Sequence, residues 1–307
     1  MKSLTKLLFA AAAGAGAYAL VRRSRRRDPA DFFGAKAVVV TGGASGIGLA
    51  IVKQLRSYGA NVLAVDIDGE ALESVAADLP GVATLRLDLA ERDAARRMIE
   101  ASVELLGDLD IVFSNAGIVW AAPFLAMTDA DIDRLVEVNF LMQVRVTREL
   151  VEFFRERGSG VIAYTGSLSS YVYSPLHSVY TGTKGGLNNF VHAVRRELAR
   201  EAGCGDIQLT VIHPNMTRTG LVAEDLFDEV TKTYWLQTPH QVAHAFLQGV
   251  ADGRREVFVE LADYGFLWGE RLAPAALDLL FAKSVSETML DKAEAAIPDS
   301  KLRKQIS

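Results

Sequence analysis

From residue 35 onward, the hydrophobic positions of this chain follow two alternating patterns. Short runs rich in β-branched residues end in glycine or a polar residue, and longer stretches follow with apolar residues every three or four positions. This alternation of strand and helix predicts a parallel sheet covered by helices, an α/β fold. The predicted strands are 37–41, 61–66, 83–88, 110–117, 160–165 and 256–260, with one more before His213. The predicted helices are 49–58, 92–106, 129–157, one from Ser178 and one from Pro239.

A glycine-rich turn joins the first predicted strand to the first helix, with the sequence Gly-Gly-Ala-Ser-Gly-Ile-Gly over 42–48. Glycines in this position permit a tight turn and close approach of a pyrophosphate to the helix N-terminus. The next strand ends in Asp66, 18 residues beyond Gly48, where a carboxylate that binds the adenosine ribose is expected. That carboxylate would repel a 2′-phosphate, and neither Ser45 nor Ile67 supplies a basic group. The pattern therefore favours NAD(H) over NADP(H).

The next two predicted strands also end in candidate ligand-binding residues, because ligands of such sheets lie at the carboxyl edge. Asp88 and Leu89 are expected near the adenine, and 115–117 (Asn-Ala-Gly) behind the cofactor. Asn115 has a second, compatible interpretation as a residue that stabilises the strand end. Asn139 lies inside the predicted helix 129–157, where asparagine mostly indicates local hydrogen bonding. Structural and functional roles are equally open for it from composition alone.

The stretch 160–186 carries the candidate chemistry. Ser167 follows a strand end, and Tyr180 and Lys184 lie four residues apart on a predicted helix, so their side chains project from one face. Free tyrosine has a pKa near 10, and a lysine one turn away would stabilise the phenolate and lower that pKa. This is a constellation for proton transfer, with the Ser167 hydroxyl placed to bond a substrate oxygen.

Composition limits the classes of function. The chain has 307 residues, of which 50% are hydrophobic and 23% charged, which is ordinary for one large globular domain. One cysteine, Cys204, excludes an intrachain disulfide framework and is typical of a reducing compartment. The net charge of −5 hides seven basic residues and no acids in 1–27, so the remainder carries −12. Such an acidic body argues against nucleic-acid binding, and no cluster of metal ligands occurs in the sequence.

The N-terminal sequence suggests attachment to a membrane. Residues 7–21 are fifteen uncharged residues followed at once by the arginine-rich 22–27. As a helix they would span about 22 Å, less than the roughly 30 Å of a hydrocarbon core. A short uncleaved anchor with the body on the cytoplasmic face is favoured by the positive-inside rule. A disordered tail on a soluble cytoplasmic protein and a cleaved signal peptide remain alternatives. Folded structure is expected to begin near Phe32.

Taken together, these motifs resemble those of the short-chain dehydrogenase/reductase family, in its order and approximate spacing over residues 35 to about 260. The matching residues are Thr41-Gly42-x-x-x-Gly46-x-Gly48, Asn115-Ala116-Gly117, Asn139, Ser167 and Tyr180-x-x-x-Lys184. The resemblance implies a single doubly wound Rossmann-type domain with a seven-stranded parallel sheet, as a homodimer or homotetramer. It also implies oxidation of a secondary alcohol or reduction of a ketone with NAD(P).

By this resemblance, Asn139, Ser167, Tyr180 and Lys184 are the catalytic residues. Tyr180 transfers the proton, Lys184 also holds the nicotinamide ribose, and Asn139 holds a water for proton relay. The cofactor-binding residues are Gly42, Ser45, Gly46, Ile47, Gly48, Asp66, Asp88, Leu89, Asn115, Ala116, Gly117, Tyr180, Lys184, Pro214, Met216 and Thr219.

The chain also departs from the family pattern. The family commonly has Pro-Gly after the sixth strand, whereas this chain has Pro214-Asn215. Asparagine tolerates a positive φ, so the turn is expected to survive. Glycines 182, 185 and 186 should weaken the helix by up to about 1 kcal/mol each relative to alanine. Because they share a face, close packing against another helix or subunit would offset that cost.

The remaining segments concern the substrate. A lid is expected over about 216–238, within a catalytic domain of 32–262 that follows the segment 1–31 and precedes a helical extension, 263–307. The apolar extension would complete the pocket, mediate dimerisation or lie on a bilayer. Candidate pocket residues are Val119, Trp120, Tyr171, Val172, Tyr173, Phe227, Tyr234 and Trp235. The leading interpretation is an NAD-dependent oxidoreductase for a hydrophobic alcohol or ketone such as a sterol, retinoid or lipid. The alternative is a non-catalytic NAD-binding regulatory or scaffold protein.

Overall fold

The computed structural model describes residues 26–218 and 236–284, with side chains as far as residue 279. Seven parallel strands form one sheet in the order β3-β2-β1-β4-β5-β6-β7. The strands are β1 (Ala37–Thr41), β2 (Asn61–Asp66), β3 (Val82–Arg86), β4 (Ile111–Ser114), β5 (Gly160–Thr165), β6 (Ile207–His213) and β7 (Glu256–Phe258). The order reverses between β1 and β4, and ligands of such sheets bind at this switch point. The expected doubly wound fold is confirmed.

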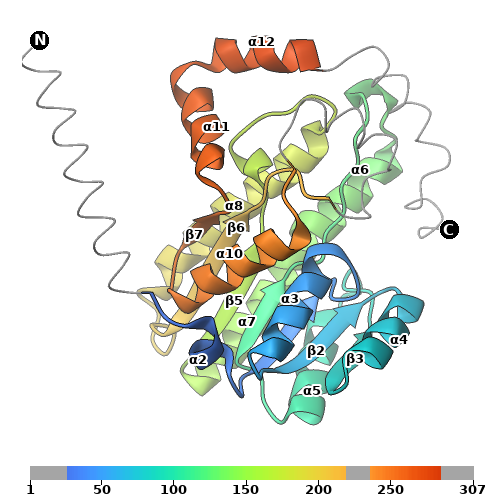
Figure 1. Cartoon of the computed structure of the whole chain (residues 1–307), viewed down its shortest axis with the longest axis vertical. Helices are drawn as coiled ribbons and strands as arrows, with labels where there is room; N and C mark the ends of the chain where they lie inside the picture. Colours follow the sequence, from blue (N-terminus) through green and yellow to red (C-terminus); the bar gives the residue numbers. More distant parts are fainter. Residues whose placement is uncertain (1–25, 219–235, 285–307) are drawn as a thin grey trace, which may run out of the picture.

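Helices cover both faces of the sheet (Figure 1). They are α2 (Pro29–Phe33), α3 (Gly46–Ser57), α4 (Gly69–Asp78), α5 (Ala94–Leu106), α6 (Asp129–Val136), α7 (Met142–Arg157), α8 (Ser178–Leu198), α10 (Pro239–Ala251), α11 (Leu261–Leu272) and α12 (Pro274–Ser284). Three short segments complete the described chain: η1 (Phe124–Ala126), η2 (Glu137–Leu141) and η3 (Leu168–Ser170). In Figure 1, α3 and α10 lie side by side in front of the sheet.

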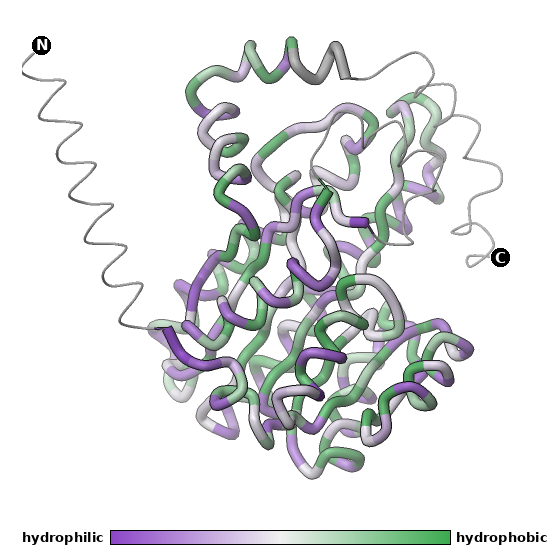
Figure 2. Tube along the Cα trace, viewed as in Figure 1, coloured by the Kyte–Doolittle hydropathy of each residue, from purple (hydrophilic) through white to green (hydrophobic). Residues whose placement is uncertain are grey.

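Alternation along the strands builds a core on each face. Val38 and Val40 of β1 pack with α3 and α10, whereas Val39 between them packs with α5 and α7 on the opposite face. A strand buried on both sides has apolar residues on both faces, which is why the centre of β1, residues 38–40, consists of three consecutive valines. Figure 2 shows hydrophobic residues along the central strands and hydrophilic ones mainly on outer helices and loops.

Several predicted boundaries differ from the observed ones by one to three residues; α3, for example, begins at Gly46 rather than at 49. β3 ends at Arg86 and β4 at Ser114, so Asp88 and 115–117 lie in loops beyond the strands. β7 ends at Phe258, and α5 begins at Ala94. The ends of strands and helices are hard to place from sequence, because the residue pattern changes little between the last residues of an element and the loop that follows.

Folded structure begins earlier than Phe32. Helix α2 starts at Pro29, and the Asp28 carboxylate caps it by accepting a hydrogen bond from the Ala30 amide at 2.8 Å. Proline at the first helical position needs no hydrogen-bond partner for its nitrogen, so the pair Asp28-Pro29 is well suited to start a helix. Phe33 at the end of α2 is fully buried and anchors this helix to α3 and the sheet.

The predicted helix 129–157 contains a π-helical segment. α6 ends at Val136, the five residues of η2 form a π-turn, and α7 continues from Met142. Thr128 is the N-cap, and its hydroxyl accepts a hydrogen bond from the Asp131 amide at 3.2 Å. A π-turn inserts one residue into an α-helix and re-aims the side chains that follow, and such segments are frequent at functional sites. Asn139 lies in the middle of this segment.

No helix among the described residues is long and apolar enough to cross a membrane. The predicted anchor, 1–27, lies almost entirely outside those residues.

Candidate active site

The glycine turn between β1 and α3 has the geometry of a phosphate cradle. Gly42 and Gly46 have φ values of +63° and +53°, a conformation that side chains rarely adopt. A Cβ on Gly48 would overlap the Gly42 carbonyl, and it would lie 2.8 Å from the Asn115 side-chain nitrogen. All three positions therefore require glycine, and the turn leaves room for a ligand to approach the backbone.

The N-terminus of α3 is open to an anion. Ser45 is the N-cap residue, but its side chain makes no capping hydrogen bond. The first amides of a helix have no partner within the helix and carry partial positive charge. An uncapped helix end behind a glycine turn is what the pyrophosphate of a dinucleotide requires, so these residues fit the expected cofactor. Ile47 follows in the first turn of α3, half-buried against the core.

Asp66 lies against the same turn. Its carboxylate accepts hydrogen bonds from the Ala44 amide at 3.1 Å and from the Asp68 amide at 3.2 Å. Sequence reasoning missed a basic neighbour: Arg86 is paired in register with Asp66 on the adjacent strand. The Arg86 side chain donates to the Ile67 carbonyl at 3.3 Å and is exposed. Only the strand register, which the sequence does not reveal, brings these two residues together.

Asn115 ties three strand ends together. Its side-chain nitrogen donates to the Thr41 carbonyl at 3.0 Å, and its side-chain oxygen accepts from the Thr165 hydroxyl at 3.0 Å. The Thr41 hydroxyl in turn accepts from the amides of Asn115 and Ala116 at 2.9 and 3.0 Å. This is the strand-end role expected for Asn115. It holds 115–117 at the switch point between β1 and β4.

Asp88 and Leu89 form the turn after β3. Asp88 accepts a hydrogen bond from the Ala90 amide at 2.9 Å, which closes this turn. The side chain of Leu89 packs in the core beside α5. A contact between Leu89 and an adenine therefore has to come from its backbone.

Ser167, Tyr180 and Lys184 converge beyond the end of β5. Burial raises the pKa of the Tyr180 phenol, while a hydrogen bond with the Ser167 side chain acts in the opposite direction. The Lys184 ammonium lies 5.8 Å from the centre of the Tyr180 ring and donates to the Thr165 carbonyl at 2.9 Å. Lys184 is only 3% exposed, and burial lowers its pKa to about 8. The three side chains meet as their spacing predicts.

The pKa of Tyr180 differs from the expectation drawn from sequence. The spacing of Tyr180 and Lys184 predicts a lowered pKa, but in this structure desolvation dominates and the pKa is raised. The Lys184 charge points to a carbonyl oxygen rather than to the phenol oxygen. Burial therefore favours the neutral form of the phenol in this structure.

Asn139 is fully buried, and its side chain is engaged in structural hydrogen bonds. Its amide oxygen accepts from the Ile118 amide at 2.9 Å, and its nitrogen donates to the Ile118 carbonyl at 2.8 Å. The same nitrogen lies 3.4 Å from the Thr183 hydroxyl of α8. These bonds fix the loop after β4 against α8 at Thr183, the residue that precedes Lys184.

The turn after β6 forms without the expected positive φ. The described non-glycine residues with positive φ are Ala35 and Leu176, so Asn215 has an ordinary backbone, and that expectation was wrong. Instead, the Asn215 side-chain oxygen accepts from the Met216 amide at 2.8 Å. The Pro214 carbonyl accepts from the Leu168 amide at 2.8 Å, which joins this turn to the loop of Ser167. Thr219 lies outside the described residues.

The candidate pocket residues divide into two groups. Trp120 is 7% exposed and packs in a small apolar cluster that includes Tyr180, and Val172 is buried with Leu168. Tyr173 is 62% exposed, whereas Tyr171 packs against Leu168 and Val172 and bonds to Glu256 through its hydroxyl. Val119 is half-buried in the loop before Trp120. The remaining candidates, Phe227, Tyr234 and Trp235, lie outside the described residues.

The C-terminal helices cover part of this wall. Phe266 of α11 and Leu277 of α12 pack against Leu168 and Val172. Of the three roles expected for the apolar extension, completing the wall near Ser167 is therefore the one that these contacts support. The outer side of α11 leaves Trp268 54% exposed.

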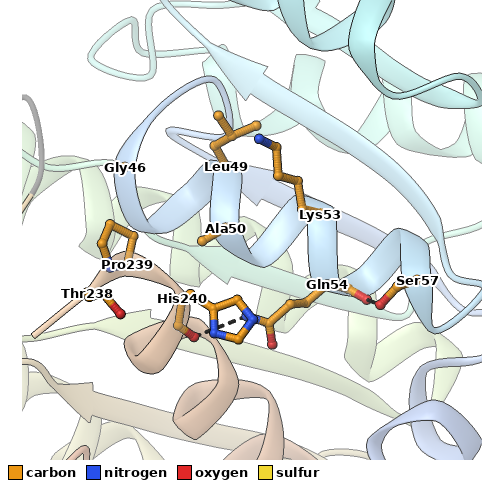
Figure 3. Close-up of a pocket in the computed structure, with 9 residues that line it drawn as sticks. All are labelled: Gly46, Leu49, Ala50, Lys53, Gln54, Ser57, Thr238, Pro239 and His240. Carbon is orange, nitrogen blue, oxygen red and sulfur yellow. Dashed lines mark hydrogen bonds between the residues drawn. The ribbon is translucent and has the colours of Figure 1, made fainter.

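A surface cavity of about 460 Å³ lies between α3 and the N-terminus of α10 (Figure 3). It is lined by Gly46, Leu49, Ala50, Lys53, Gln54, Ser57, Thr238, Pro239 and His240. The Gln54 side chain reaches from α3 to α10 and donates to the His240 carbonyl at 3.1 Å (Figure 3). Tyr180 and Ser167 do not line this cavity, so it is separate from the proton-transfer residues.

A dinucleotide cradle at the switch point of a parallel sheet, with a Ser–Tyr–Lys group beside it, defines a Rossmann-type oxidoreductase. The family model described as short chain dehydrogenase matches residues 36–229. The chain belongs to the short-chain dehydrogenase family, whose members bind NAD(P), and it is an oxidoreductase acting on CH–OH or keto groups.

Curated relatives carry related activities. Versicolorin reductase of Emericella nidulans is 33% identical over 204 residues, which are 65% of this chain and 74% of that protein. The 3beta-hydroxysteroid dehydrogenase 2 of Eggerthella lenta is 37% identical over 152 residues, or 48% of this chain and 58% of that one. L-xylulose reductase of Bos taurus is 32% identical over 182 residues, which are 59% of this chain and 71% of that protein.

Solved structures agree on the architecture. The 3-ketoacyl-(acyl-carrier-protein) reductase from Brucella melitensis, complexed with NADH, has a TM-score of 0.66 at 25% identity and covers 74% of this chain and 97% of that one. A short chain dehydrogenase/reductase from Burkholderia phymatum has a TM-score of 0.72 at 18% identity and covers 81% and 96%. At 18% identity, the similarity to the Burkholderia phymatum structure shows a shared fold only.

Proposed function

We propose that this protein transfers a hydride between NAD(H) and a hydrophobic secondary alcohol or ketone, with Tyr180 as the proton donor or acceptor. The observation that carries the proposal is the meeting of Ser167, Tyr180 and Lys184 beyond β5, beside the glycine turn of β1 and α3. NAD supplies the hydride acceptor or donor when bound.

Each of the three residues has a chemical task. In ketone reduction, the protonated Tyr180 phenol donates a proton to the carbonyl oxygen, and in alcohol oxidation the phenolate accepts one. The Ser167 hydroxyl bonds the same substrate oxygen and steadies its developing charge. Lys184 holds the ribose next to the nicotinamide, and its positive charge, 5.8 Å from the centre of the Tyr180 ring, favours the phenolate against the larger effect of burial. Its ammonium, now on the Thr165 carbonyl at 2.9 Å, is close enough to Gly117 that a Cβ there would lie 3.4 Å away.

Asn139 is proposed to support the proton relay through its backbone. Its side chain already satisfies Ile118 and approaches Thr183, so it has little capacity left for a water molecule. The π-turn in which it lies alters the hydrogen bonds of the local carbonyls. A backbone carbonyl of this segment that is left without its usual helical hydrogen bond would be the group that holds the water.

The preference for NAD(H) is proposed on the position of Asp66. Its carboxylate lies beside Ala44 of the glycine turn, where the ribose hydroxyls are expected and where a 2′-phosphate would be repelled. Arg86 provides a competing positive charge one strand away. NADH is nevertheless expected to bind tighter than NADPH by about tenfold, or about 1.4 kcal/mol. Titration of both cofactors, with Asp66→Ala expected to abolish the difference and Arg86→Ala to enlarge it, checks this. Tighter binding of NADPH by the wild type would overturn it.

The hydrophobic substrate class is proposed on the wall around the site. Trp120, Leu168 and Val172 form buried apolar surface near Tyr180 and Ser167, and α11 and α12 extend it. The named relatives do not decide the class, since one is a hydroxysteroid dehydrogenase and another a xylulose reductase. A large apolar substrate gains affinity from burial of its surface against such a wall.

The test is turnover. We expect absorbance at the NADH band to change with sterols, retinoids or long-chain secondary alcohols and ketones, and to change far less with sugar alcohols. Turnover of polyols alone would overturn the hydrophobic class. Tight NADH binding without turnover of any alcohol or ketone would favour a regulatory or scaffold role.

Two further proposals concern the setting of the enzyme. The segment 1–27 is proposed to anchor it at the cytoplasmic face of a membrane, on the strength of its apolar run and arginines. A homodimer or homotetramer is proposed with the glycine face of α8 as a contact. A Cβ on Gly182 or Gly185 would meet nothing within 4 Å, whereas one on Gly186 would lie 3.5 Å from the Phe140 ring. The first two positions are thus open to a partner.

A further inference from the structure

The loop that carries Ser167 is fastened to the end of β6 by three hydrogen bonds. The Gly166 amide donates to the Ile212 carbonyl at 2.9 Å, and the Leu168 amide donates to the Pro214 carbonyl at 2.8 Å. Between them, Nδ1 of His213 lies 3.2 Å from the Ser167 carbonyl. The approach is close, since a Cβ on Gly166 would lie 2.9 Å from the Ile212 carbonyl oxygen. His213 contributes the one side-chain bond of the three.

His213 is buried and faces an acceptor on each side. Its exposed fraction is 0%, and its ring lies between Phe258, stacked at 5.0 Å, and Tyr171, edge-on at 5.1 Å. Nε2 lies 3.2 Å from a carboxylate oxygen of Glu256, and Nδ1 faces the Ser167 carbonyl. Because a carbonyl and a carboxylate only accept, both bonds form together when both ring nitrogens carry hydrogen.

Glu256 is held as a carboxylate in this cluster. The same oxygen that faces His213 accepts a hydrogen bond from the Tyr171 hydroxyl and lies 3.3 Å from Nε2 of His192. Burial alone would raise the pKa of Glu256, but the hydrogen bonds from His213 and Tyr171 outweigh it and lower the pKa to about 2. A carboxylate oxygen only accepts, so Nε2 of His213 is the donor in the 3.2 Å contact with Glu256.

His192 differs from His213 in its second partner. Arg195 lies 2.7 Å from Nδ1 of His192, and since arginine only donates, that nitrogen accepts. His192 therefore donates from Nε2 alone, and among the described residues it makes no hydrogen bond to the Ser167 loop. The two histidines share Glu256, but only His213 links it to Ser167.

We propose that His213, oriented by Glu256, is a positioning residue for Ser167. Its Nδ1–H fixes the Ser167 carbonyl, and so keeps the Ser167 hydroxyl at the Tyr180 phenol. The inference rests on the proposed function, because it concerns how Ser167 contributes to proton transfer. It also gives a role to the residue that precedes Pro214 in a turn that departs from the family pattern.

The experiment is a double-mutant cycle that compares kcat values for the best alcohol or ketone substrate found in the turnover test. His213→Phe keeps the ring between Tyr171 and Phe258 but removes both hydrogen bonds, and we expect kcat to fall about tenfold with NADH affinity unchanged. In a Ser167→Ala background the same change should have no further effect, since His213 acts through Ser167. Full multiplication of the two effects would overturn the proposal, because a general structural defect would lower kcat in either background.

Two further variants make the result specific. His213→Asn retains an amide donor near the position of Nδ1, so we expect kcat within about threefold of wild type. It also tests the bond to Ser167 if His213→Phe fails to fold. His192→Phe is the matched control, because it makes the same substitution at the other histidine that contacts Glu256 and should leave kcat unchanged. If His213→Asn is as slow as His213→Phe, or His192→Phe equally slow, the positioning role is wrong. Absence of turnover in the wild type would instead reject the proposed function.

Discussion

At the scale of single residues, burial acts on Tyr180 and Lys184 in opposite directions. It raises the pKa of the phenol and lowers that of the ammonium to about 8, because desolvation disfavours the charged form of each. The protonated phenol suits ketone reduction at neutral pH. Alcohol oxidation needs the phenolate, which becomes more abundant as pH rises.

This difference predicts a pH dependence that differs between the two directions. The kcat/KM of alcohol oxidation is expected to rise as pH increases from about 6 to about 8, where Lys184 keeps at least half of its charge, and that of ketone reduction to change little because the Tyr180 phenol stays protonated. Steady-state rates in both directions, at saturating cofactor and across this range, check it. An oxidation rate that decreases with pH would contradict Tyr180 as the base.

The residue scale is also where sequence prediction succeeded and failed most clearly. Tyr180 and Lys184 were predictable because a spacing of four on a helix places two side chains on one face. Asn115 was predictable because it follows a buried strand. The Thr165 carbonyl that accepts from Lys184 and the pairing of Arg86 with Asp66 were not, since both depend on how separate strands align.

At the scale of elements, the glycines of α3 and α8 have different reasons to be glycine. Gly48 has no room for a Cβ, because it would overlap the Gly42 carbonyl. Gly185 has an ordinary helical φ and open space beside it. The same substitution should therefore have opposite consequences at these two positions.

Gly48→Ala is expected to weaken NADH binding by tenfold or more, about 1.4 kcal/mol, because it displaces the cradle. Gly185→Ala, the matched control, should leave NADH binding unchanged and, measured on the monomer without the proposed α8 contact, raise the free energy of unfolding by up to about 1 kcal/mol. Fluorescence titration and urea unfolding measure the two quantities. Normal NADH affinity in Gly48→Ala would contradict the proposed cradle.

The elements themselves were predictable to different degrees. Buried parallel strands are continuous apolar runs, so their existence and order along the chain were evident. The π-turn at 137–141 was not, since one inserted residue leaves the apolar periodicity of the flanking helices almost intact. The adjacency of β6 and β7, which brings Glu256 to His213, is likewise a property of the folded sheet.

At the scale of the whole molecule, the chain combines one catalytic sheet with terminal segments that extend beyond it. α11 and α12 reach back to cover Leu168 and Val172, so the C-terminal part contributes to the substrate side. The N-terminal end of the described chain is attached through α2, whose Phe33 is fully buried. Residues 1–25 precede it, and their apolar and arginine-rich sequence is the basis for the proposed anchor.

The anchor predicts how the full-length protein fractionates. It should sediment with membranes and remain there after washes with high salt and with carbonate, because an apolar segment is held by burial rather than by charge. A variant that lacks residues 2–27 should become soluble and keep NADH binding. Release of the full-length protein by salt alone would contradict the anchor and leave only an electrostatic attachment.

The central claim is that Tyr180 transfers the proton that accompanies hydride transfer to or from NAD(H). Tyr180→Phe removes one oxygen atom and retains the ring that packs beside Trp120. We predict that this variant binds NADH within about threefold of wild type but turns over the best alcohol substrate at least about a thousandfold more slowly. Turnover near the wild-type rate in Tyr180→Phe would contradict the account.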